Sequence, residues 1–129
     1  MRDHTGLRGF QLADELAMLV YRLTNSFPAS EQFGLTNQMR RAAVSAASNI
    51  VEGCGRSSQK DYVHFLDIAL GSVREVGYQA SLAHRLGLLD HARHSAMDAH
   101  CTETSRTLCA LILAVRNPKA SRPRQRGRF

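Results

Sequence analysis

Apolar residues in two long segments recur at alternating steps of four and three, and this spacing constrains the fold more than any other feature of the sequence. In one segment the series is Tyr62, Leu66, Ala69, Val73, Val76, Ala80 and Ala83. In the other it is Met97, Cys101, Thr104, Leu108, Leu111 and Val115. A shorter series with the same steps is Leu12, Leu16, Leu19 and Leu23. Such spacing keeps one face of a helix apolar, as in the contact seams of helical bundles.

Residues that begin or end helices divide the chain between these series. Pro28 stops the first helix. Ser58 can cap the third helix, which is expected to begin at that residue. Gly87 can close that helix in a left-handed conformation, after which Asp90 can cap the last one. We find no strand alternation. The sequence therefore predicts an all-α, antiparallel up-down four-helix bundle over residues 1–115, with helices near 10–26, 36–53, 58–86 and 91–115.

The expected helix over 36–53 has two distinct faces when its residues are placed at about 100° per residue. Its apolar face carries Leu35, Met39, Ala42, Ala43, Ala46, Ala47 and Ile50. A second line of residues, the polar stripe, consists of Gln38, Arg41, Ser45, Asn49 and Glu52. A catalytic interpretation would make Ser45 a nucleophile and Glu52 its base, but they lie roughly 10 Å apart along the axis and the stripe has no histidine. We expect instead that Ser45, Asn49 and Glu52 hydrogen-bond to a neighbouring helix or loop.

The excess positive charge lies at one end of the chain. The sequence has 17 Lys and Arg against 11 Asp and Glu, a net charge of +6. Six of the cations, and no acid, fall in residues 116–129: Arg116, Lys119, Arg122, Arg124, Arg126 and Arg128. Residues 1–115 are therefore formally neutral. With Pro118, Pro123 and Gly127 and a single large apolar residue, Phe129, this basic tail is expected to be disordered when unbound.

Several classes of protein are disfavoured by composition. Three cysteines, an odd number, and an amino end without an apolar run favour a cytoplasmic protein with reduced thiols. The longest apolar run, from Leu108 to Val115, is far shorter than the roughly 20 residues of a membrane span. His91 and His94 are one helical turn apart and could both bind zinc, but no second pair of ligands lies nearby in the sequence at the spacing that a zinc site requires. We expect no membrane contact, metal, cofactor or catalytic residue.

A dense series of motifs carries a resemblance to a known family. The motifs are Phe27-Pro28, Glu31-x-Phe33-Gly34-Leu35-Thr36, Gln38-x-x-Arg41-Ala42-x-x-Ser45, Asn49-Ile50-x-Glu52-Gly53-x-Gly55-Arg56 and Phe65-Leu66-x-Ile68-Ala69-x-Gly71-Ser72-x-x-Glu75. They resemble the four-helix-bundle proteins encoded by intervening sequences in bacterial large-subunit ribosomal RNA genes, which are related to accessory proteins of diversity-generating retroelements. The resemblance implies a bundle that assembles into a ring, commonly a homopentamer. The related retroelement proteins bind nucleic acid and a reverse transcriptase through a basic surface. The resemblance brings no catalytic residues.

Two hypotheses for the function remain. In the first, a non-enzymatic oligomer binds RNA, which we favour, or DNA, without sequence preference, through the basic tail or through Arg40, Arg41 and Arg56 on the bundle. Because the chain has no Trp and few Phe or Tyr, we expect contacts to the nucleic-acid backbone rather than base stacking. In the second, a structural or adaptor oligomer binds a protein partner and the tail only keeps it soluble. In either case Ser45, Asn49, Glu52 and Gly53 are expected to be structural or interface residues.

Overall fold

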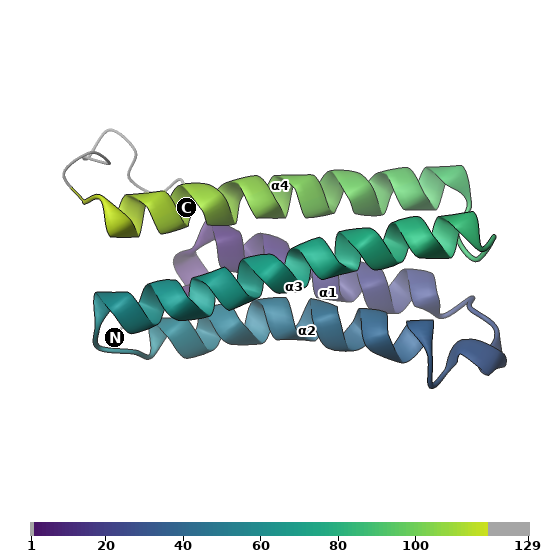
Figure 1. Ribbon diagram of the computed structural model, residues 1–129, viewed down its shortest axis with the longest axis horizontal. Helices are drawn as coiled ribbons and strands as arrows, with labels where there is room; N and C mark the ends of the chain where they lie inside the picture. The colour runs from purple at the N-terminus through teal and green to yellow at the C-terminus, as the bar shows by residue number, and fades with distance from the viewer. Residues whose placement is uncertain (1, 119–129) are drawn as a thin grey trace.

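The structure is a computed structural model in which residues 2–118 are described, and within them every regular element is helical (Figure 1). The four long helices are α1 (Arg8–Thr24), α2 (Leu35–Cys54), α3 (Gln59–Arg85) and α4 (His91–Arg116). Two short 3-10 helices, His4–Gly6 and Ala29–Glu31, precede α1 and α2. These bounds differ by at most two residues from the ranges expected from the sequence. The all-α, four-helix prediction is confirmed for this part of the chain. Of the tail expected to be disordered over 116–129, Arg116 is instead the last residue of α4, because the helix continues one residue further than expected, and 119–129 lie outside the described residues.

The four long helices lie side by side around one apolar core (Figure 1). α2 packs on α1 and α3, and α4 packs on α3 and α1. Every member of the apolar series of α3 is buried, as are the members of the α4 series from Met97 to Leu111. In α1 the expectation needs correction, because Val20 is fully buried while Leu19 and Leu23 are only half-buried. Val20 follows Leu16 by four residues, a step of about one helical turn that keeps it on the core face.

The residues expected to cap helices do so. Ser58 Oγ accepts a hydrogen bond from the Asp61 amide at 3.0 Å. The Asp90 carboxylate accepts one from the Arg93 amide at 2.8 Å, and this bond holds the pKa of Asp90 below its usual value. Gly87 has φ 79°, a left-handed conformation that turns the chain from α3 towards α4. In residues 2–118, no helix has the length and apolar character required to cross a membrane.

Candidate functional site

The polar stripe runs along the boundary between α2 and α3. Ser45 Oγ lies 3.0 Å from Ser72 Oγ of α3, so the two hydroxyls form a hydrogen bond between the helices. Asn49 Nδ2 donates to the Ser45 carbonyl at 2.8 Å and to Ser45 Oγ at 3.0 Å. Ser45 therefore makes the expected bond to a neighbouring helix, whereas the Asn49 amide bonds within α2. Ser72, which sequence reasoning left without a role, is the partner that was missed.

The stripe ends where α2 comes very close to α3. Glu52 forms an ion pair with Arg56, whose guanidinium lies over the Phe65 ring at 4.8 Å from the centroid. A Cβ at Gly53 would lie 3.0 Å from Phe65 Cβ and 3.2 Å from Tyr62 Cδ1. Any larger residue here would require Phe65 and Tyr62 to shift, which accounts for Gly53 in structural terms.

The two residues considered for catalysis contact different partners. Ser45 hydrogen-bonds to Ser72 and Asn49, while Glu52 pairs with Arg56. A serine nucleophile needs a base within hydrogen-bond reach, and Ser45 has none among these partners. Among the described residues, no group of three His, Cys, Asp or Glu side chains could hold a metal ion.

His91 and His94, which were considered for a metal site, lie next to a third histidine, His84, to which the sequence analysis gave no role. His94 of α4 stacks on His84 of α3, with ring centroids 4.7 Å apart and planes 14° apart. His84 Nδ1 in turn lies 3.0 Å from the Leu89 carbonyl oxygen. This stack lies at the end of the bundle where α3 passes into α4, so these rings serve helix packing there.

The three bundle arginines lie in three different environments. Arg40 bridges α2 to the end of α1: its Nε donates to Thr24 Oγ1 at 2.9 Å and its Nη2 to Asn25 Oδ1 at 3.2 Å. Arg56 is paired with Glu52, as described above. Arg41 is exposed and makes no hydrogen bond or ion pair with any residue of 2–118. The structure therefore does not bring these arginines into one patch, and only Arg41 has its charge available.

Arg41 lines a hollow of about 440 Å³ at the start of α2. Its walls are Phe33, Asn37, Gln38, Arg41, Ala42, Ser45 and Glu75. Phe33, the residue before the Gly34 that precedes α2, has 88% of its surface exposed. Sequence reasoning gave no site role to Phe33 or to Glu75. The available signal was the position of Phe33 two residues before α2, on which Asn37 and Arg41 lie about one turn apart.

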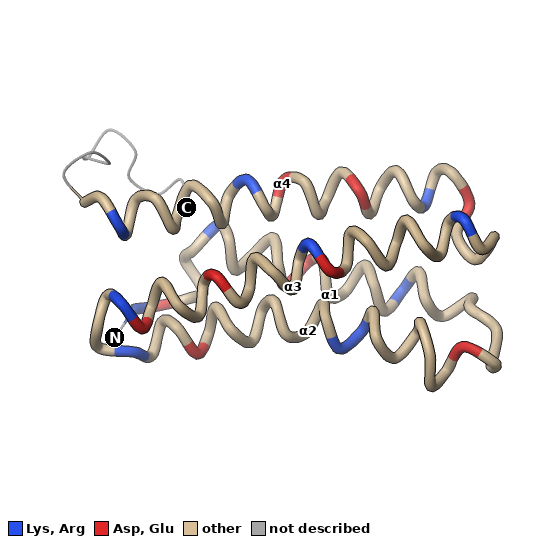
Figure 2. Tube along the Cα trace, viewed as in Figure 1, with Lys and Arg blue, Asp and Glu red and all other residues tan. Residues whose placement is uncertain are grey.

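The described charges are otherwise mixed. Figure 2 shows Lys and Arg interleaved with Asp and Glu along the helices. Arg116, the first tail cation, is the last residue of α4, and its Nη2 donates to Asp67 Oδ2 of α3 at 3.0 Å. The remaining tail candidates, Lys119, Arg122, Arg124, Arg126 and Arg128, lie outside the described residues.

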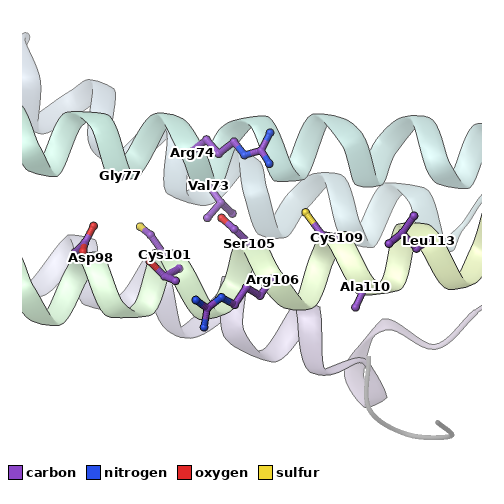
Figure 3. Close-up of a pocket in the computed structure, with 11 residues that line it drawn as sticks. Val73, Arg74, Gly77, Asp98, Cys101, Ser105, Arg106, Cys109, Ala110 and Leu113 are labelled. Atoms are coloured by element: carbon purple, nitrogen blue, oxygen red, sulfur yellow. The ribbon is translucent and has the colours of Figure 1, made fainter. Parts of the chain in front are cut away.

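A groove of about 600 Å³ runs between α3 and α4 (Figure 3). Its lining includes the small residues Gly77 and Ala110, the half-buried Cys109 and Leu113, which is 60% exposed. Arg74 of α3 and Arg106 of α4 also line it, as does Asp98. Cys101 is buried in its wall, and burial raises the pKa of this thiol to about 12. Cys101 is therefore protonated at neutral pH and unsuited to nucleophilic chemistry.

Comparison with known proteins identifies the family. Among curated proteins, none matches the chain. A solved structure, a protein of unknown function from the S23 ribosomal protein family of Bacteroides thetaiotaomicron, is similar with a TM-score of 0.74 and 23% identity, over 81% of this chain and 95% of that one. At this identity the likeness supports the fold. The family model described as 23S rRNA-intervening sequence protein matches residues 5–110, which confirms the resemblance carried by the motifs. The chain therefore belongs to the 23S rRNA-intervening sequence protein family.

Proposed function

We propose that the chain is a non-enzymatic, oligomeric protein that binds nucleic acid unspecifically through the phosphate backbone, with RNA favoured over DNA as its natural ligand. The observation that carries this proposal is the separation of charge along the sequence, with all of the excess in residues 116–129 and none in 1–115. Clustered cations bind nucleic acid by releasing counterions from phosphates, without reading the bases. The name of the family favours RNA as the nucleic acid.

The test is a chain that ends after Pro118. This truncation removes five cations, Lys119, Arg122, Arg124, Arg126 and Arg128, and keeps the pair between Arg116 and Asp67. It leaves 12 Lys and Arg, 17 less 5, against 11 Asp and Glu. For the full chain, about three to five neutralised phosphates give a slope of log affinity against log salt on the order of −2 to −5. We expect the truncated chain to lose most of its affinity for unrelated single strands and most of this slope.

A full-length variant with the same five residues changed to Gln is the matched control, since it removes the charge but keeps the chain length. It should bind as weakly as the truncated chain. Equal binding by the truncated and full chains would instead place the site on the bundle, with Arg41 as the available cation there. Absence of binding by the full chain at low salt would contradict the proposal and favour the adaptor hypothesis.

We further propose that antiparallel up-down subunits assemble head-to-tail into a ring, commonly a homopentamer as the family resemblance implies. The order of helix contacts, α1 with α2, α2 with α3, α3 with α4 and α4 with α1, puts the α3/α4 groove opposite the outer face of α1 and α2. That outer face exposes Met18, Val44 and Val51. Asp14 lies one turn before Met18 and complements the cations of the groove, Arg74 and Arg106. Two different faces that fit each other generate a closed ring when the rotation from one subunit to the next closes on itself.

Native mass spectrometry at micromolar concentration tests the assembly. Leu113→Glu in the groove and Met18→Glu on the opposite face change side chains that are 60% and 58% exposed in the single chain, so neither should unfold it. Both should shift the protein to smaller species. Leu86→Glu, at a 59% exposed residue beyond the end of α3, is the control and should leave the assembly intact. Monomers from the unmodified chain would contradict the ring.

The second candidate function is that of a structural or adaptor oligomer that binds a protein partner. The outer face of α1 and α2, which exposes Met18, Val44 and Val51, favours it, since exposed apolar side chains on one face mark protein contacts. In this case the assembly would form and the full chain would not bind RNA. The mass measurement and the RNA titration together therefore distinguish the two functions.

We also propose that the protein has no catalytic activity and resides in the cytoplasm. All three cysteines are free thiols, which suits a reducing compartment. The partners of Ser45 and Glu52 leave no nucleophile beside a base in the polar stripe. Nuclease activity that survives repurification and is lost in Glu52→Gln would contradict the first statement.

A further inference from the structure

Phe33 is the most exposed of the large apolar side chains in the described residues. The turn that carries it is nevertheless well ordered by hydrogen bonds. The Gly34 amide donates to the Glu31 carbonyl at 3.0 Å, and the Leu35 amide donates to Glu31 Oε1 at 3.2 Å. Leu35, two residues after Phe33, is buried. The ring is therefore held at the surface by its own turn rather than displayed on a loose end.

The hollow beside this ring is mostly polar. Asn37 and Gln38 supply side-chain amides from the first turns of α2, and Arg41 supplies the one guanidinium of α2 that has no partner in residues 2–118. Glu75 forms part of the opposite wall on α3, where its Oε2 lies 3.4 Å from Gln79 Nε2. The hollow thus combines an aromatic face, an exposed cation, two amides and a carboxylate.

This combination matches the chemistry of an unpaired nucleotide. A base stacks on an aromatic ring, and amides and carboxylates hydrogen-bond to its exposed edges. A phosphate next to it pairs with a guanidinium. A protein partner would be expected to meet a more apolar surface, and a simple anion would be repelled by Glu75 and would not need the ring.

We propose that Phe33 and Arg41, with Asn37, Gln38 and Glu75, form a binding site for one unpaired nucleotide of single-stranded RNA. The inference rests on the proposed RNA binding and adds to it a contact that the tail lacks, because tail cations address the backbone alone. It also revises the expectation that aromatic side chains take no part: one exposed ring next to a free arginine is sufficient for one base. The site distinguishes single strands from duplexes, whose bases are already stacked and paired.

The experiment uses the absence of tryptophan from the chain. Phe33→Trp in the full-length protein introduces a single indole at the site. A single-stranded oligoadenylate of about twelve nucleotides should quench its fluorescence saturably, because a base stacked directly on the indole quenches its emission. A duplex of the same length should bind, as measured by anisotropy of a labelled strand, without quenching. Ile68→Trp, at a 38% exposed position on α3 one turn before Ser72, is the control and should not be quenched.

Affinities give a second measurement. Phe33→Ala should weaken binding of the single strand by about tenfold or more and leave duplex binding within about twofold. Arg41→Gln should weaken binding of the single strand more than Arg22→Gln does, although Arg22→Gln removes the same charge from an exposed arginine of α1.

Three results would overturn the proposal. If the single strand binds the Phe33→Trp protein with unchanged fluorescence, the nucleotide site is wrong while the tail proposal stands. If no RNA binds the full chain, both fail. If the fluorescence changes on dilution without RNA, Phe33 belongs to a contact between copies of the chain.

Discussion

Ser45 of α2 and Ser72 of α3 join their helices through a hydroxyl pair, with the two oxygens 3.0 Å apart near the middle of both helices. The same Ser45 Oγ accepts from Asn49, so it is bonded on two sides. Ser72 is only 9% exposed and needs this partner in place of water. The pair fixes how α2 and α3 are aligned along their axes.

Ser45→Ala is expected to lower the free energy of unfolding by about 1–2 kcal/mol, because it leaves the Ser72 hydroxyl buried without its partner. Adding Ser72→Ala should cost less than the sum of the single changes, since the orphaned group is then absent. Urea unfolding measures all three variants. Ser48→Ala, at an exposed residue of the same helix, is the control and should stay within about 0.5 kcal/mol of the parent.

Two glycines are expected to respond in opposite directions to the same substitution. Gly53→Ala should lower the melting temperature, because the new Cβ would lie 3.0 Å from Phe65 Cβ and force α2 and α3 apart. Gly71→Ala should raise stability by about 0.5–1 kcal/mol, because nothing lies within 4 Å of its Cβ position and alanine favours the helix. Thermal unfolding followed by circular dichroism tests both. A stabilised Gly53→Ala would show that α3 can yield at this contact.

Substitutions of the adjacent residues Arg40 and Arg41 are expected to differ in their effect on the free energy of unfolding. Arg40→Gln is expected to destabilise the fold by about 1–2 kcal/mol, because it removes the bonds to Thr24 and Asn25 and the contact with the Tyr21 ring. Arg41→Gln should change stability by less than about 0.5 kcal/mol, since Arg41 makes no contact of this kind with the described residues. Denaturant unfolding of the two variants decides this, and equal losses would contradict the distinction drawn between them.

Thiol labelling should report on the α3/α4 groove. Cys109 is half-buried in that groove, whereas Cys54 and Cys101 are buried and burial raises the pKa of both thiols. We expect one thiol to react quickly with a disulfide reagent at pH 8, and Cys109→Ala to abolish that phase. If the groove is covered in the proposed ring, the rate should fall as protein concentration rises. A rate independent of concentration would show that the groove stays open.

Much of the fold was accessible from the sequence because its signals are local. For α1, α3 and α4, the step of four and three, together with Pro28, Ser58, Gly87 and Asp90, placed the helix bounds within two residues of those observed. One local pattern gave a wrong prediction of the core residues of α1. Leu19 and Leu23 continue its apolar series, yet Val20 is the residue that is fully buried. Several residues of one helix can satisfy the same spacing, and the rotation of the helix against its neighbours selects among them.

The sequence by itself determined that the chain is helical, where its helices begin and end, and that its excess charge is confined to residues 116–129. Each of these follows from residues close together in the chain. Only the tertiary structure decided that Ser45 meets Ser72, that Arg40 but not Arg41 is bonded within residues 2–118, and that Phe33 shares a hollow with Glu75. The physical reason is that these contacts depend on the relative rotation and axial alignment of α1, α2 and α3. The packing of the whole core sets that alignment, and no single helix encodes it.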